Sequence, residues 1–146
     1  MEIINPTCEE LCDLMCGKVE EDDMINEWEI KTEISVIVSG QDIDDILCTA
    51  FEGGINYWCG GVKVVGEYLG EYASDQISRG GTLKLFIEDE EEWAELTMDN
   101  LLIGVSKYLQ KDTTIIYKGE LDTCQIDADI ADQIIQYALF GDVIYG

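Results

Sequence analysis

Polar and apolar residues alternate along several short segments, and this alternation restricts the possible fold more than any other feature of the sequence. It is longest between Glu27 and Val38, and it recurs in 62–64 and in 82–87. A period of two is typical of strands that bury one face and expose the other. Strands of parallel sheets covered on both faces carry continuous apolar runs instead. The sequence therefore predicts a largely antiparallel sheet.

Segments with helical periodicity lie between these strands. Apolar residues recur at spacings of three and four in 39–51, 97–111 and 127–140, so each segment predicts a helix with one buried face. Gly53 and Gly54 are expected to end the first of these helices, because glycine adopts the left-handed conformation of a helix C-terminus without a steric penalty.

The order of these elements predicts the fold class. Thr97 is expected to cap the start of the second helix, and Gly141 the end of the third. A further short strand is expected in 113–119. We therefore predict an α+β protein, in which a mostly antiparallel sheet of three to four strands has helices packed on one face.

The chain has the length and composition of a single domain. It has 146 residues, one proline, no internal repeat and no Pro-rich or Ser/Gly-rich linker. We predict one domain over 1–146, in which 1–26 is a helical, acidic N-terminal segment and 27–146 is the core. A Thr-x-x-Glu capping box at Thr7 and Glu10 predicts the helix of that segment.

Three of the six cysteines, Cys8, Cys12 and Cys16, follow one another at intervals of four on this predicted helix. Eight helical residues rise ~12 Å, so these thiols cannot converge on one zinc ion with Zn–S distances of ~2.3 Å. We interpret them as small hydrophobic residues. All six cysteines are expected to be free thiols, and no metal or cofactor is predicted.

The sequence gives no indication of a membrane or secretory protein. No apolar run approaches the ~18 residues that span a bilayer. The N-terminal residues lack the basic flank and apolar core of a signal peptide. We therefore expect a cytoplasmic location and no membrane partner.

The charge of the chain indicates what kind of partner it has. The 32 acidic residues outnumber the eight basic ones, histidine is absent, and the formal net charge is -24. Such a charge repels nucleic acid and anionic membranes and attracts basic surfaces. Large basic surfaces in cells are commonly those that hold nucleic acid, so we expect a basic protein partner and no direct nucleic-acid binding. Adaptation to high salt, or solubility alone, is the plainer alternative.

Three acid-rich segments supply the candidate partner-binding residues. Glu27, Glu29 and Glu33 lie on the outward face of the predicted strand, where side chains repeat every ~6.6 Å. This distance is about two base-pair rises of DNA, so their carboxylates would imitate phosphates. The candidates are Glu20, Glu21, Asp22, Asp23, Glu27, Glu29, Glu33, Glu88, Asp89, Glu90, Glu91 and Glu92.

The sequence carries no signature of catalysis. Without histidine, the usual general base, the imidazole-dependent triads and the histidine-containing zinc sites are excluded. No phosphate-binding or dinucleotide-binding glycine motif and no nucleophile elbow is present. The aspartates Asp127, Asp129 and Asp132 stand at a helix start, where capping explains them better than calcium binding. We expect a protein without enzymatic activity.

The stretch EGGINYW offers an alternative site. It places two aromatic residues beside paired glycines, an arrangement that suits the floor of a small-molecule pocket. The candidate pocket residues are Gly53, Gly54, Asn56, Tyr57 and Trp58. The glycines are equally explained as a helix end and the aromatic side chains as part of the core.

The stretch EGGI-x-YW and the ending YALFGDVIYG resemble a largely uncharacterised group of short acidic proteins carried by bacteriophages and other mobile elements. The resemblance extends over about 40–146. Small phage proteins of extreme negative charge often inhibit host defence nucleases by imitating DNA. The resemblance therefore implies an inhibitor of a CRISPR effector or a restriction enzyme in the host cytoplasm. A module that sequesters a signalling nucleotide at EGGINYW, and a homodimeric state, are left open.

Overall fold

The computed structural model describes residues 26–146. One compact unit is formed by 35–146, and 26–34 is not assigned to this unit. The helix predicted over the first cysteines and the acids Glu20, Glu21, Asp22 and Asp23 lie outside the described residues. The fold of the unit 35–146 is described below.

Three α-helices carry most of the apolar periodicity of this unit. Their bounds are Gly40–Thr49 for α2, Met98–Lys111 for α3 and Ala128–Phe140 for α4. Each begins at a residue whose side chain accepts a hydrogen bond from the first turn. Thr97 caps α3, and Gly141, with a φ of 76°, ends α4 in the left-handed conformation. Both predicted caps are therefore confirmed, and Asp127 caps α4 as expected.

The strands form two antiparallel sheets. The larger sheet has the order β1-β2-β3, with β1 at Cys59–Val64, β2 at Leu83–Ile87 and β3 at Glu92–Leu96. The smaller sheet pairs β4, Ile116–Tyr117, with β5, Glu120–Leu121. Short 3-10 helices lie at Ala73–Asp75 (η4) and Thr123–Gln125 (η5). The predicted α+β class is confirmed, although β3 and β5 were not expected.

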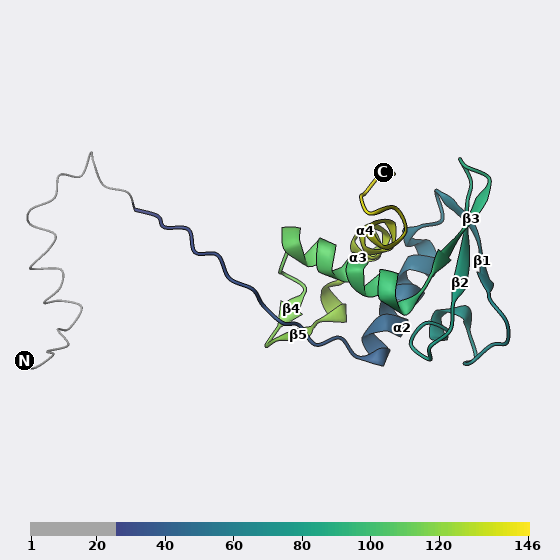
Figure 1. The fold of residues 1–146 in the computed structure, drawn as a ribbon, viewed down its shortest axis with the longest axis horizontal. Helices are drawn as coiled ribbons and strands as arrows, with labels where there is room; N and C mark the ends of the chain where they lie inside the picture. The colour runs from purple at the N-terminus through teal and green to yellow at the C-terminus, as the bar shows by residue number, and fades with distance from the viewer. Residues whose placement is uncertain (1–25) are drawn as a thin grey trace, which may run out of the picture. The chain divides into compact units, whose positions relative to one another are not determined.

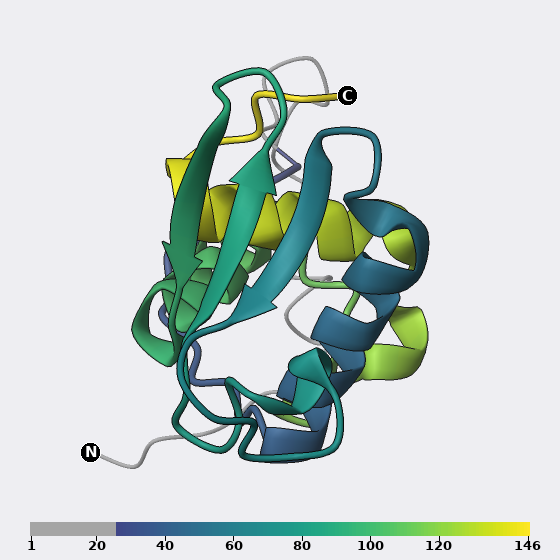
Figure 2. The ribbon, with the colours of Figure 1, turned by 90° about the vertical axis from the view of Figure 1, so that its right-hand side faces the viewer.

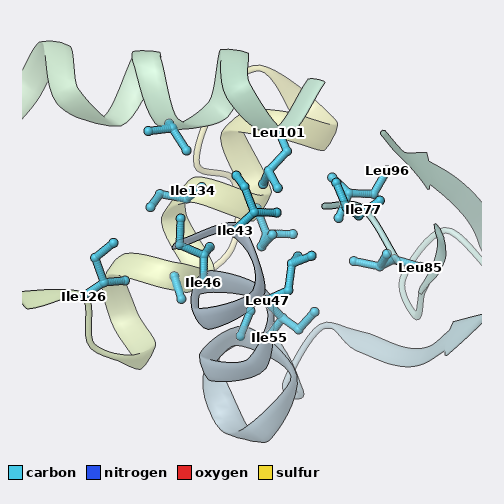
Figure 3. Packing of buried hydrophobic residues seen from close by; sticks show 14 of the residues in the cluster. Ile43, Ile46, Leu47, Ile55, Ile77, Leu85, Leu96, Leu101, Ile126 and Ile134 are labelled. Carbon is cyan, nitrogen blue, oxygen red and sulfur yellow. The ribbon is translucent and has the colours of Figure 1, made fainter. Parts of the chain in front are cut away.

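Helices pack on one face of the three-stranded sheet (Figures 1 and 2). Leu83, Leu85 and Ile87 of β2 point to that face and are buried, whereas the intervening Lys84 and Phe86 point away from it. Figure 3 shows side chains of α2, the sheet, α3 and α4 meeting in one core, among them Ile43, Ile46, Leu47, Ile55, Leu85, Leu96, Leu101 and Ile134. Gly104 lets α3 approach α4, because a Cβ atom there would lie 2.5 Å from the backbone oxygen of Ile134.

The strand predicted between Glu27 and Val38 is wrong. Within this stretch only Ile37 forms a bridge, in parallel with Glu120. The side chains of Trp28 and Ile30 are 80% and 83% exposed. Alternation of polar and apolar residues indicates which face a strand would bury. It does not ensure that a neighbouring strand is present to accept and donate the backbone hydrogen bonds. Every residue of 27–34 is exposed.

The helical path ends at Gly54, as predicted, but the left-handed conformation expected of Gly53 and Gly54 is wrong. Neither glycine adopts the left-handed conformation, and the helical path continues beyond α2 through a π-helical turn, η3, at Ala50–Gly54. Gly54 is buried, and a Cβ atom on it would lie 2.7 Å from the backbone oxygen of Ala128. Gly54 is thus required for the close approach of η3 to α4.

Candidate functional site

The acid run Glu88–Glu92 forms the turn between β2 and β3 and the first residue of β3. All five side chains are exposed. The backbone reverses with Glu91 at a φ of 53°, a left-handed conformation that few residues other than glycine adopt. The Glu88 carboxylate lies over Gly60 of β1, because a Cβ atom on Gly60 would fall 1.8 Å from its Oε1 atom. The turn therefore holds five consecutive exposed acidic residues at one end of the sheet.

The strand expected to carry three of the other predicted acids is not formed. Glu27, Glu29 and Glu33 are exposed in a segment without helix or strand. The strand spacing that supported their imitation of phosphates therefore does not apply to them. Of the twelve candidate acids, only those of the β2–β3 turn form a defined cluster in the part of the chain that the structure describes.

Trp58 of the EGGINYW stretch belongs to the core. Its side chain is 2% exposed and stacks on Tyr145, with ring centroids 5.6 Å apart and planes 7° from parallel. Phe140 meets the same indole edge-on at 5.5 Å. The two stretches that carry the family resemblance, far apart in sequence, thus meet in one aromatic cluster.

A buried carboxylate, Asp132 of α4, holds this cluster by hydrogen bonds. Its Oδ1 atom accepts from Trp58 Nε1 at 2.7 Å and from Gln136 Nε2 at 2.8 Å. Its Oδ2 atom accepts from the Tyr57 hydroxyl at 2.5 Å. Among the residues described, Asp132 is the one carboxylate that is buried. Three donors therefore replace the water that burial removes from it.

Gln136, which is also buried, fixes the C-terminal residues in the same network. Its Oε1 atom accepts from the backbone N–H groups of Ile144 and Tyr145, both at 2.8 Å. Its Nε2 atom donates to the Tyr145 carbonyl at 3.2 Å. We call Tyr57, Trp58, Asp132, Gln136 and Tyr145 the Asp132 network.

The Asp132 network bears directly on the pocket hypothesis. The polar atoms of Tyr57 and Trp58 that a ligand would use are already hydrogen-bonded within the protein. Gly54 is closed off by Ala128, whereas Gly53 and Asn56 are exposed. A pocket at EGGINYW stays a hypothesis. The hydrogen bonds to Asp132 already explain the presence of Tyr57 and Trp58.

Sequence reasoning missed the roles of Asp132 and Gln136. The prediction that Asp132 helps to cap the helix is wrong, because Asp127 is the N-cap of α4 and Asp132 is buried within the helix. A signal was present, since the two polar residues stand four positions apart beside the apolar Ile134 and Ile135 and so share one helix face.

The pKa values of two tyrosines and two cysteines are raised. Burial, and then the hydrogen bond to Asp132, raise the pKa of Tyr57 to about 12. Burial raises the pKa of Tyr145, and the charges of Asp89 and Glu90 raise it further. Burial likewise raises the pKa of the free thiols Cys48 and Cys59. Protonated phenols and thiols are poor nucleophiles, so the arrangement does not favour covalent chemistry at neutral pH.

Residues 26–146 contain no group of three or more Cys, Asp or Glu side chains placed to hold a metal ion. None of the helices described is both long and apolar enough to cross a membrane. No protein-family model, curated protein or solved structure was found to match the chain.

Proposed function

We propose that this protein is a phage-encoded, non-enzymatic inhibitor that imitates DNA and occupies the nucleic-acid-binding surface of a basic host protein, such as a CRISPR effector or a restriction enzyme. The observation that carries the proposal is the exposed run of five carboxylates, Glu88–Glu92, at one turn of a chain whose net charge is -24. A folded unit with such a turn presents a dense negative surface to a groove lined by Arg and Lys.

The chemistry of recognition is electrostatic. The net negative charge attracts a basic target over a distance and speeds the encounter, and ion pairs between carboxylates and target Arg or Lys then hold the complex. Both contributions weaken as salt screens the charges. Because each exposed ion pair contributes only ~0–1 kcal/mol, single Glu→Gln changes are expected to have little effect on affinity.

A host target is sought with the immobilised full-length chain in a nuclease-treated bacterial lysate, at low and then at moderate salt. We expect nucleic-acid enzymes to be retained at low salt, released as salt rises, and displaced by DNA. Retention of neutral proteins alone, or co-purification of a nucleotide without a protein, would contradict the proposal.

The role of the turn is tested against a variant of equal net charge. The first variant reverses all five acids of Glu88–Glu92 to Lys. The matched control reverses five scattered exposed acids: Glu52, Glu67, Glu71, Glu120 and Asp142. If the turn imitates DNA, the first variant loses target binding far more strongly than the control. Equal losses would show that only net charge matters.

A further inference from the structure

Two of the eight basic residues stand opposite each other on the face of the three-stranded sheet that the described helices leave uncovered (Figure 2). Lys63 of β1 and Lys84 of β2 are cross-strand partners. Like charges directly opposite on neighbouring strands repel each other and destabilise the sheet. Glu95 stands opposite Lys84 on its other side and offsets part of this repulsion, and an anion between the two lysines would offset it further.

Two aromatic side chains lie beside this pair on the same face. Phe86 and Trp93 are cross-strand partners with ring centroids 5.2 Å apart. A Cβ atom on Gly61 would lie 3.8 Å from the Trp93 ring, so the ring extends across β2 toward β1. The Lys63 ammonium lies 5.3 Å from the Trp93 ring centre, yet the Trp93 side chain remains 46% exposed. We call Lys63, Lys84, Phe86 and Trp93 the cationic aromatic face.

We propose that the cationic aromatic face binds a nucleotide, with the base stacked on Trp93 and the phosphate between Lys63 and Lys84. Aromatic rings on an open sheet are a sequence-tolerant platform for nucleobases. The Lys63 side chain is flexible. When a nucleobase stacks on the Trp93 ring, the Lys63 ammonium can therefore move from that ring to the phosphate. The phosphate would also relieve the repulsion between the two lysines.

The surroundings limit the ligand to one or two nucleotides. Glu95 is the partner of Lys84 on its other side, and the Glu88 carboxylate lies over Gly60 beyond the aromatic residues. A longer single strand would have to pass these carboxylates and would be repelled by them. The cationic aromatic face adjoins the acidic turn, since Trp93 follows Glu92 directly, but nucleotide binding there does not depend on the proposed inhibition of a host protein.

The test titrates the full-length chain with AMP, GMP, CMP and UMP while NMR follows the indole N–H resonances. Adenosine and inorganic phosphate are the ligand controls, and a short oligothymidylate tests the size limit. We expect nucleotides to shift the Trp93 resonance and to bind more tightly than adenosine or phosphate alone. No shift of Trp93 at millimolar nucleotide, or phosphate binding equal to that of AMP, would overturn the proposal.

Two sets of variants test the base-binding and the phosphate-binding residues separately. Trp93→Ala, and separately the double change Lys63→Gln with Lys84→Gln, should each weaken nucleotide binding about tenfold or more, as expected for the loss of stacking or of phosphate contacts. The matched control is Lys118→Gln, because Lys118 lies at the same 5.3 Å over Tyr117 but outside this face. Binding by the double variant at wild-type strength, or equal weakening by Lys118→Gln, would refute the site.

Two further outcomes decide whether the site is specific. Trp28→Ala removes another exposed tryptophan and should leave nucleotide affinity unchanged. If oligothymidylate binds more than about tenfold tighter than any nucleotide, the size limit is wrong and the face is a single-strand platform. Near-ultraviolet circular dichroism of the buried Trp58 confirms that each variant is folded.

Discussion

Asp132 and the β2–β3 turn place the same chemical group in opposite environments. The Asp132 carboxylate is buried and accepts hydrogen bonds from Tyr57, Trp58 and Gln136. The five carboxylates of Glu88–Glu92 are exposed to water. Among the residues described, one buried acid thus joins distant parts of the fold, whereas the acids of the turn remain hydrated and contribute to the negative surface on which the proposed function depends.

The physical basis of the difference is solvation. A buried carboxylate loses several kcal/mol of hydration and remains charged only if donors replace the water. Asp132 has three such donors, and removing it would leave the buried Trp58 indole without its acceptor, whereas Gln136 would keep the Tyr145 carbonyl. An exposed carboxylate keeps its hydration, so its main energetic effect is repulsion from neighbouring acids, which salt screens.

The largest expected effect comes from removing the aromatic centre of the Asp132 network. We expect Trp58→Ala to lower the free energy of unfolding by about 3–5 kcal/mol, because it creates a cavity beside Phe140 and Tyr145. Trp93→Ala, on the exposed face, should cost about 1 kcal/mol or less. Urea denaturation measures both changes. Similar losses for the two tryptophans would contradict the assignment of Trp58 to the core.

The next largest effect concerns the buried carboxylate itself. Asp132→Ala should destabilise the protein by about 3 kcal/mol, since three buried or half-buried donors lose the hydrogen bond to this carboxylate. The control is Asp129→Ala in the first turn of the same helix, where an exposed acid contributes about 0.3–1 kcal/mol through the helix dipole. If both changes cost the same in urea, burial does not distinguish Asp132 from the other acids.

A smaller effect of opposite sign is expected at the turn. Replacing the four glutamates of Glu88–Glu92 by Gln and Asp89 by Asn should raise the free energy of unfolding by about 1 kcal/mol in total, because repulsion is relieved. Added salt should raise the urea midpoint of the natural chain more than that of this variant. A natural chain whose stability is flat or falls with salt would show that the acids are paired rather than repelling.

The smallest effect is the alkaline titration of Tyr57. Its pKa is raised from 10.0 to about 12, so the neutral phenol favours the folded state. This contribution is complete below pH 10.0 and is lost as the pH rises towards about 12. Because Tyr57 is 56% exposed, we expect only a slight loss of stability over this window. Tyr57→Phe should make the loss shallower in urea denaturation, whereas an unchanged pH profile would separate Tyr57 from the Asp132 network.

Much of the fold was predictable because its signals are local. The periodicity of α3 and α4, the caps at Thr97 and Asp127, and the alternation of β2 depend on residues within one or two turns of each other. The exposure of the acid run also followed from its charge. The strand β3 was not predicted because it begins within the acid run, which is untypical of a strand. Its backbone hydrogen bonds are completed by β2, and the local sequence does not show this pairing.

The candidate sites were less predictable because they depend on contacts between distant residues. Tyr57 and Trp58 were singled out from the sequence, but their acceptor Asp132 lies 75 and 74 positions away. Lys63 and Lys84 carry no local pattern, and they become neighbours only through the register of β1 and β2.

By itself, the sequence determined the negative charge, the segments able to form helices and the face that each would bury. These properties follow from composition and from spacings within a single element. Only the tertiary structure decided that β2 has a neighbour on each side, whereas 27–34 has none among the residues described. It also decided that one aspartate among many is buried. Burial requires a donor or a strand from elsewhere in the chain, and local periodicity does not say which distant segment supplies it.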